Sequence, residues 1–336
     1  MHKAELYSYH DGRVYCNLCN HSCVLRDGQR GRCRVRINRG GELYSMVYGQ
    51  IVAENVDPVE KKPLFHLLPG TRTFSLSTRG CNFRCLHCQN ASISQVEKDA
   101  DPTHLCKMYS PQDIVDGAVQ SGCKTISYTY VEPTVFYEFA VDCAELALAE
   151  GVRNIFVSNG YMSEAAVRRL APLTFGINID CKAFSDDFYK KICGARLQPV
   201  LDSIELYMQL GVWVEVTTLL IPGLNDSKAE LRDLSRFLVS ISPDIPWHVT
   251  AFHPSYKLTT VPSTPLSTLD LARDIGLEAG LRYVYAGNIP GSGREDTICY
   301  VCGTTLIERH GFSILANNLQ NGRCGQCLAD IAGRWV

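Results

Sequence analysis

Long apolar runs, a strong net charge and repeated segments are all missing from this sequence. No stretch approaches the roughly 18 apolar residues that a membrane span requires, so we expect no membrane association. The first ten residues are polar and contain no apolar core of a signal peptide, which favours a cytoplasmic protein. The formal net charge of −2 provides no overall field for nucleic acid, which we do not expect as a partner.

The even charge has one local exception, a basic run from residue 26 to residue 39 in which a single acid, Asp27, accompanies six arginines. These are Arg26, Arg30, Arg32, Arg34, Arg36 and Arg39. Basic residues beside a metal module would suit nucleic acid, but no aromatic residues are interleaved with them. We therefore interpret the run as a solvated face or as a docking face for an acidic protein.

Cysteine, in contrast, is abundant, with 16 residues. In a reducing compartment so many thiols indicate bound metal rather than disulfides. Eleven of them form three clusters, and the other five are expected to act as small apolar side chains. The five are Cys106, Cys123, Cys143, Cys181 and Cys193.

The chain divides into three segments. Residues 1–68 carry four clustered cysteines, residues 69–290 alternate between strand and helix patterns, and residues 291–336 carry four more clustered cysteines. The last segment opens with Gly-Ser-Gly at 291–293, which is typical of a linker.

The middle segment predicts repeated βα units. Strands are expected at 73–78, 125–130, 154–158, 176–181, 213–220, 247–252 and 282–285. Helices are expected at 135–150, 163–170, 200–210, 228–240 and 268–279, with Ser163 and Ser227 as caps. This alternation indicates an α/β fold, a full or partial parallel β/α barrel with small N-terminal and C-terminal cysteine-rich metal modules. In such barrels the chemistry lies at the C-terminal ends of the strands.

The central cysteine cluster follows the first expected barrel strand. Cys81, Cys85 and Cys88 have the spacing Cys-x3-Cys-x2-Cys. Three thiolates on one tight loop can hold three irons of a [4Fe–4S] cubane and leave the fourth iron open to another ligand. A zinc site with His87 as the fourth ligand is the alternative.

This spacing at this position resembles the signature of radical S-adenosylmethionine (SAM) enzymes. The resemblance implies that SAM chelates the open iron and is cleaved by one electron to methionine and a 5′-deoxyadenosyl radical, which removes hydrogen from a substrate. It also implies a low-potential electron donor of the flavodoxin or ferredoxin type. His87 occupies the place of the family's usual aromatic residue near the adenine.

Further resemblances place SAM-binding residues after later strands. Glu132 matches the acid of the Gly-Gly-Glu-Pro motif, which binds the amino group of SAM; Tyr130 and Val131 replace the two glycines, so the backbone should differ. Ser158 and Asn159 resemble the ribose-contacting turn, for which a plain Asn-Gly turn is the alternative.

Asp180 and Lys182 resemble a pair in glycyl-radical-enzyme activases, such as the activating enzymes of pyruvate formate-lyase. Alternate residues share one face of a strand, so both should point into the barrel. A buried structural ion pair is the alternative. His248 and His253 lie in and after the sixth strand and are tentative substrate residues, although single histidines often have structural roles.

Residues 57–66, which read Asp-Pro-Val-Glu-Lys-Lys-Pro-Leu-Phe-His, and the flanking cysteine segments resemble the radical enzyme of the AmmeMemoRadiSam system. That resemblance implies Memo-type and AMMECR-type partner proteins. It does not supply a substrate.

The outer clusters are four-cysteine sets. Cys16, Cys19, Cys23 and Cys33 fit zinc most simply or a second iron–sulfur cluster, with His21 as a spare ligand. Cys299, Cys302, Cys324 and Cys327 form two Cys-x2-Cys knuckles typical of a zinc ribbon; a rubredoxin-like iron or an auxiliary cluster is the alternative.

Three functions remain open from the sequence. The first is a radical SAM enzyme that acts on a partner protein's glycine in the manner of an activase. The second is radical modification of a small molecule or a nucleic acid together with the companion proteins. The third, a non-enzymatic zinc-ribbon binding protein, is disfavoured by the intact central cysteines.

Overall fold

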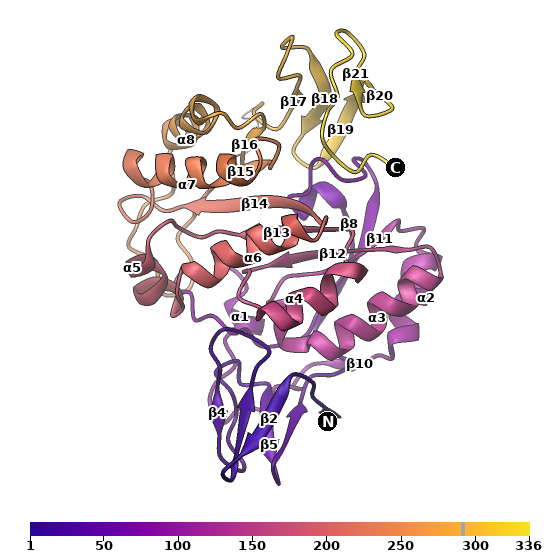
Figure 1. The fold of residues 1–336 in the computed structure, drawn as a ribbon, viewed down its shortest axis with the longest axis vertical. Coiled ribbons are helices and arrows are strands. Elements are labelled where there is room, and N and C mark those ends of the chain that lie inside the picture. The colour runs from indigo at the N-terminus through magenta and orange to yellow at the C-terminus, as the bar shows by residue number, and fades with distance from the viewer. Residues whose placement is uncertain (290–292) are drawn as a thin grey trace.

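The computed structural model describes residues 1–289 and 293–336, so two residues of the expected linker, 291 and 292, lie outside the described residues. Its centre is an eight-stranded sheet with the order β16-β15-β14-β13-β12-β11-β9-β8 (Figure 1). These strands are β8 (Ala53–Pro58), β9 (Arg72–Ser77), β11 (Thr125–Tyr128), β12 (Arg153–Ser158), β13 (Gly176–Asp180), β14 (Trp213–Leu220), β15 (Trp247–Ala251) and β16 (Val284–Gly287).

The seven predicted strands are all present and run parallel to one another from β9 to β16. Their register aligns apolar side chains: Ile179, Val216 and Trp247 lie side by side across three strands, and all three are buried. Among the described strands, β16 and β8 are the two edges of the sheet, so the barrel is partial and open.

The strand β8 was not predicted, and it comes from the segment expected to form the N-terminal module. It pairs antiparallel with β9 over its whole length. Its sequence Ala-Glu-Asn-Val-Asp-Pro is polar and mostly solvent-accessible, as is common for an edge strand.

Helices connect the parallel strands and cover the sheet. The longer ones are α2 (Pro111–Gln120), α3 (Tyr137–Ala149), α4 (Glu164–Leu170), α6 (Gln198–Gln209), α7 (Lys228–Ile241) and α8 (Leu266–Ala279). Short turns are α1 (Ala91–Ser94), α5 (Asp186–Phe188), the 3-10 helices η1 (Val59–Lys61), η2 (Pro133–Phe136) and η3 (Ala171–Leu173), and the π-helix η4 (Tyr189–Cys193). Within the described ranges, no helix has the length and apolar character needed to cross a membrane.

The predicted caps are confirmed, because Ser163 accepts from the Ala166 amide and Ser227 from the Glu230 amide. The helix α2 was not predicted. Ser110 and Asp113 form a reciprocal capping box at its start.

Small sheets at the two ends of the molecule carry the outer cysteines (Figure 1). The N-terminal ones are β1-β6-β5, β2-β3-β4 and β10-β7, and the C-terminal ones are β17-β18-β19 and β20-β21. Their bounds are β1 (His2–Lys3), β2 (Tyr7–His10), β3 (Arg13–Cys16), β4 (Val24–Leu25), β5 (Arg36–Arg39), β6 (Glu42–Ser45), β7 (Gln50–Ile51), β10 (Lys107–Met108), β17 (Thr297–Ile298), β18 (Thr305–His310), β19 (Ser313–Asn317), β20 (Leu319–Gln320) and β21 (Arg323–Cys324).

The C-terminal module is anchored to the chain between β8 and β9. The Arg309 guanidinium donates to the carbonyl of Phe65 at 2.8 Å, and the Arg334 amide donates to the carbonyl of His66 at 2.7 Å. The module is therefore held against the open side of the partial barrel.

Candidate active site

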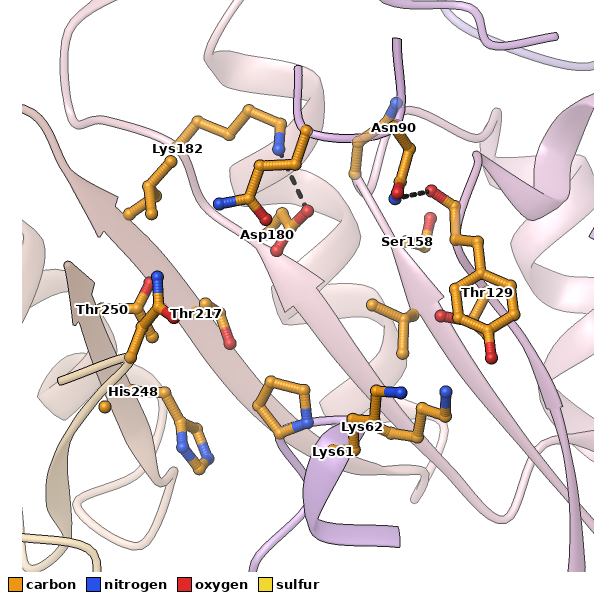
Figure 2. A pocket seen from close by; sticks show the side chains of 18 of the residues that line it. Lys61, Lys62, Asn90, Thr129, Ser158, Asp180, Lys182, Thr217, His248 and Thr250 are labelled. Atoms are coloured by element: carbon orange, nitrogen blue, oxygen red, sulfur yellow. Dashed lines mark hydrogen bonds and ion pairs between the residues drawn. The ribbon is translucent and has the colours of Figure 1, made fainter. Parts of the chain in front are cut away.

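A cavity of about 730 Å³ opens at the C-terminal ends of the barrel strands (Figure 2). Ten of the predicted site residues line it, although they come from segments far apart in the sequence. They are Cys81, Cys85, His87, Cys88, Glu132, Ser158, Asn159, Asp180, Lys182 and His248. This placement follows from parallel strands, whose carboxyl ends all meet at one edge of the sheet.

The loop after β9 carries the three central cysteines into this cavity. Its backbone is pinned to the end of η4: the Arg84 amide donates to the Cys193 carbonyl at 2.8 Å, and the Leu86 amide donates to the Ile192 carbonyl at 3.0 Å. Burial raises the pKa of the Cys81 thiol, so this thiolate is favoured only when a cation is bound to it. Three soft sulfur donors on one loop beside an open cavity fit a [4Fe–4S] cluster with one free iron.

Glu132 is the most densely bonded acid of the cavity. Its carboxylate accepts from the Ser158 hydroxyl at 2.9 Å, from the Asn159 amide at 2.7 Å, and from both the amide and the hydroxyl of Thr134. Burial raises the pKa of Glu132, while these donors favour the carboxylate and oppose the shift. The four donors favour the ionised form of Glu132, which can receive an ammonium group.

Ser158 and Asn159 were predicted to contact the ribose of SAM. Both line the cavity, and both also donate hydrogen bonds to the Glu132 carboxylate, Ser158 from its hydroxyl and Asn159 from its backbone amide. The side-chain nitrogen of Asn159 donates to the side-chain oxygen of Asn82 at 2.7 Å. This bond connects the turn after β12 to the cysteine loop.

Tyr130 stands where the resembled motif has glycine. It adopts a left-handed backbone conformation, with φ of 64°, which favours glycine and is uncommon for tyrosine. The side-chain amide of Asn90 donates to the Tyr130 carbonyl at 2.6 Å, and the Tyr130 hydroxyl donates to the Asp57 carboxylate at 2.5 Å. Tyr130 therefore holds a backbone conformation that glycine adopts readily, while the difference from the motif's backbone stays a prediction.

Asp180 is the last residue of β13, Lys182 follows the strand, and the two form an ion pair at 3.0 Å (Figure 2). The ion pair of the structural alternative is therefore present and lines the cavity, while a role toward SAM stays a prediction. Burial alone would lower the pKa of Lys182, but the charges of Asp180 and of the Cys85 and Cys193 sulfurs raise it. Lys182 therefore remains a cation close to a central cysteine.

His248 and His253 differ in their placement. His248 is buried in β15, lines the cavity and contacts the Glu215 carboxylate through Nε2 at 2.6 Å. His253 is exposed, contacts Ser263 at 3.1 Å, and is not among the described residues that line the cavity. The substrate role predicted for His253 gains no support from this position.

Sequence reasoning missed residues in the cavity wall and behind it. Glu215 lies in β14, fully buried, and also accepts from the amides of Phe65 and His66. Residues two apart in a strand share one face, and Thr217, two residues after Glu215, lines the cavity. This spacing was the signal that could have indicated that Glu215 points to the same side of the sheet. Lys62, which is paired with Asp57 at 2.7 Å, was quoted only as part of a resembled motif.

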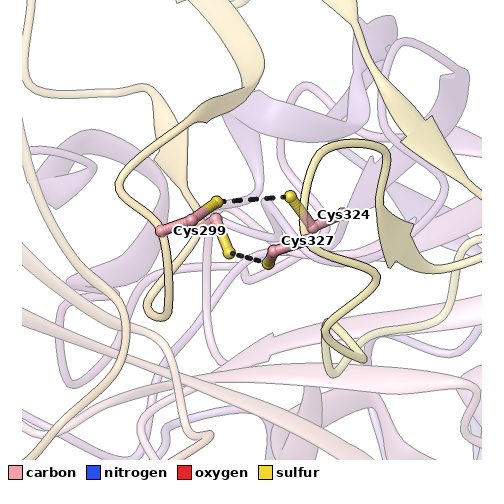
Figure 3. Close-up of side chains that lie close together, drawn as sticks. Cys299, Cys324 and Cys327 are labelled. Carbon is pink, nitrogen blue, oxygen red and sulfur yellow. Dashed lines mark hydrogen bonds between the residues drawn. The ribbon is translucent and has the colours of Figure 1, made fainter.

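The C-terminal cysteines converge as predicted. The ligand atoms of Cys299, Cys302, Cys324 and Cys327 all lie within 4.8 Å of one another. The Cys299–Cys327 and Cys302–Cys324 sulfur pairs are each 3.6 Å apart (Figure 3). Four thiols at this spacing can hold one tetrahedral metal ion.

The N-terminal cysteines line a second, smaller cavity behind the central loop. Cys16, Cys19, Cys23 and Cys33 share it with Arg36, Asn82 and Thr134. The spare ligand predicted at His21 also lines it, but its Nε2 bonds the Asn82 carbonyl at 2.8 Å.

Comparisons with known proteins point to one family. A family described as the Radical SAM superfamily matches residues 75–237. The uncharacterized protein MJ0808 of Methanocaldococcus jannaschii is 44% identical over 320 residues, which is 94% of each chain. The pyruvate formate-lyase-activating enzyme of Clostridium pasteurianum is 26% identical over 176 residues, or 52% of this chain and 71% of that enzyme.

A likeness of fold supports the same assignment. The crystal structure of a radical SAM methyltransferase from Sphaerobacter thermophilus superposes with a TM-score of 0.51 at 16% identity, covering 70% of this chain and 71% of that one. With the cysteine loop, the open parallel sheet and these relatives considered together, the chain belongs to the radical SAM superfamily.

Proposed function

We propose that this protein reductively cleaves SAM and uses the product to remove hydrogen from a substrate, in a manner similar to an activase. The carrying observation is that three cysteines on one loop, the carboxylate of Glu132 and the half-buried Lys182, from three separate segments, face one cavity. When bound, the [4Fe–4S] cluster would supply the electron that breaks the carbon–sulfur bond of SAM, and the resulting adenosyl radical would remove the hydrogen.

The residues of the chain would bind and orient SAM. Cys81, Cys85 and Cys88 would hold the cluster, and Glu132 would receive the methionine ammonium as a charge-assisted hydrogen-bond partner. Lys182, kept charged by Asp180, would offset the negative charge of the cysteine-bound cluster. His87 is buried beside these groups, and burial lowers its pKa to about 3, so a neutral imidazole would face the adenine.

The substrate side of the cavity is built by other elements. Its walls include Lys61 and Lys62 from η1, His248 from β15, and residues 310–312 of the C-terminal module. Because an additional module supplies part of the cavity wall, a substrate other than the protein glycine of an activase is also supported. A small molecule processed with Memo-type and AMMECR-type partners is therefore the second candidate, and it follows from the resemblance of residues 57–66.

The C-terminal cysteines would bind zinc. Their sulfurs are close enough for one tetrahedral ion, for which four cysteine ligands are a common structural set. Zinc there would fix the module that forms the cavity wall and would not take part in the radical chemistry.

Isotope tracing tests the hydrogen-abstraction step and identifies the substrate. The reduced enzyme is incubated anaerobically with SAM and a cell extract grown in deuterated medium, and 5′-deoxyadenosine is analysed by mass spectrometry. We expect deuterium in the 5′-deoxyadenosine, and fractionation of the extract by this signal leads to the donor. Cleavage of SAM in every fraction without any deuterium would contradict hydrogen abstraction.

A further inference from the structure

The N-terminal four-cysteine centre lies directly against the loop that carries the central cysteines. Asn82, the neighbour of Cys81, lines the N-terminal cavity together with all four cysteines. A side chain at Gly80 would lie 3.1 Å from the Cys33 carbonyl and 2.6 Å from Val35, so glycine is required for this approach. The two metal-binding segments are therefore packed without an intervening layer.

The N-terminal cavity is built for a negatively charged group. Arg36 lines it with only 2% of its surface exposed; its Nη2 pairs with Glu138, while Nε and Nη1 find no partner among the described residues. A buried guanidinium with unpaired donors is costly unless an anion faces it. Metal-bound thiolates are such an anion, and the Arg32 amide already donates to the Cys23 sulfur at 3.5 Å.

The spacing of the sulfurs separates this centre from the C-terminal one. Within residues 1–289 and 293–336, the C-terminal set is the only group of three or more candidate ligands whose donor atoms all lie within 4.8 Å. Neither the four N-terminal sulfurs nor the three central ones form a group of that tightness. A single zinc ion, with zinc–sulfur bonds of about 2.3 Å, draws four sulfurs close together, whereas a multi-iron cluster holds them farther apart.

Short polar contacts link the two centres. His21, two residues after Cys19, donates from Nε2 to the Asn82 carbonyl at 2.8 Å. The Arg84 guanidinium bridges the segments as well, because it donates to the carbonyls of both Arg32 and Cys81. The path for an electron from the N-terminal centre to the central loop would therefore cross a single hydrogen bond, from His21 to Asn82.

The outer surface at this junction is basic. The positive charges of Arg32, Arg84 and Arg196 all act on His21, and Arg32 and Arg196 are exposed. Such a surface attracts an acidic protein and speeds its association. The contact would depend on charge rather than on an apolar patch. The expected complex is therefore transient and sensitive to salt.

We propose that Cys16, Cys19, Cys23 and Cys33 hold a second iron–sulfur cluster that relays electrons to the central one. The donor would be an acidic one-electron carrier of the ferredoxin or flavodoxin class, docked on the arginines around His21. One electron leaves the carrier, which becomes oxidised by one electron. It reaches the central cluster and is consumed when SAM is split into methionine and the adenosyl radical. This relay rests on the proposed function.

Metal analysis and spectroscopy test the relay without relying on turnover. We expect anaerobically prepared wild-type protein to contain about eight irons and about one zinc, with two overlapping reduced-cluster signals in electron paramagnetic resonance. The double variant Cys16→Ser/Cys19→Ser should keep about four irons and one signal that changes when SAM is added. Matched variant Cys302→Ser should lose zinc and keep the iron. About four irons and two zincs in the wild type would overturn the proposal, whatever the variants do.

Comparison of reductants then tests the route. In the double variant, SAM cleavage driven by a reduced ferredoxin should fall at least about tenfold, whereas cleavage driven by dithionite should fall much less. Arg196→Glu should raise the KM for the ferredoxin, and Arg232→Glu on α7 is the matched control. Equal losses with both reductants would overturn the relay. Absence of cleavage by wild-type protein with dithionite would instead refute the proposed function.

Discussion

At the scale of single residues, two charged groups of the cavity, Glu132 and Lys182, are matched by several donors or by an opposite charge. Glu132 accepts four hydrogen bonds, and Lys182 is paired with Asp180. An unmatched buried charge would cost several kcal/mol, so these pairings favour the charged forms. The groups that would meet SAM are thus held in place before it binds.

Replacement of the carboxylate tests this view. We expect Glu132→Gln to weaken SAM binding by at least about tenfold, because the amide removes the negative charge that faces the ammonium group. Anaerobic equilibrium dialysis with labelled SAM measures the change, and iron analysis checks that the cluster is retained. Glu145→Gln, at an exposed position of α3, should leave the affinity unchanged. Equal affinity of Glu132→Gln and wild type would remove Glu132 from the binding site.

At the scale of elements, a buried hydrogen-bond network connects the N-terminal halves of the neighbouring strands β14, β15 and β16. Glu215 bonds His248, and His66 bonds the Tyr285 hydroxyl at 2.5 Å and the Ala332 carbonyl at 2.7 Å. A carbonyl only accepts, so His66 Nδ1 is the donor and its Nε2 accepts from Tyr285. The native state therefore holds a neutral His66.

The neutral histidine predicts a pH dependence of stability. Burial lowers the pKa of His66 from 6.5 to about 4, so below pH 6.5 the unfolded chain binds a proton that the folded chain does not. The free energy of unfolding should therefore fall as the pH decreases from 6.5 towards 4, by about 1 kcal/mol per pH unit. Urea unfolding of wild type and His66→Gln between about pH 7.5 and pH 5.5 measures this, and an identical slope in both would contradict it.

The helix α2 offers a test of local stability. Ser110→Ala removes the half of the capping box in which the Asp113 amide donates to the Ser110 hydroxyl, and should lower the free energy of unfolding by about 1 kcal/mol. Ser92→Ala, outside the cap, is the control. A thermal midpoint that is unchanged in Ser110→Ala would show that tertiary packing holds this end.

Sequence patterns predicted the parallel strands well, because each is a short buried run bounded by turns, as in residues 213–220 of β14. They did not predict β8, since Glu54 and Asn55 give a polar edge strand no apolar alternation. The openness of the sheet was also left undecided, because strand curvature depends on packing between distant segments. Spacing located the cysteines, whereas Glu215 was missed because burial is not visible in an acid within a strand.

At the scale of the whole molecule, three cysteine centres are arranged around one barrel. The C-terminal module forms part of the cavity wall, and its four cysteines, which could hold a metal, lie in the same small unit as Arg309, which bonds Phe65. Loss of the metal should therefore loosen the wall while the barrel stays folded.

Limited proteolysis measures that loosening. Wild-type protein treated with a zinc chelator, and the variant Cys299→Ser, should be cleaved faster within residues 296–336 than the untreated wild type, because metal binding supplies much of the stability of a small module. Fragments ending before residue 296 should accumulate as a stable barrel. Cleavage first within the sheet would contradict a role confined to the C-terminal module.

The central claim is that Cys81, Cys85 and Cys88 hold a cluster with one iron open to SAM, and the most direct measurement is 5′-deoxyadenosine formation by the anaerobically reduced protein. We expect methionine and 5′-deoxyadenosine from the wild type and none from the triple variant Cys81→Ala/Cys85→Ala/Cys88→Ala, with the variant Cys106→Ala, outside the three clusters, still active. Cleavage of SAM by the triple variant would contradict the account.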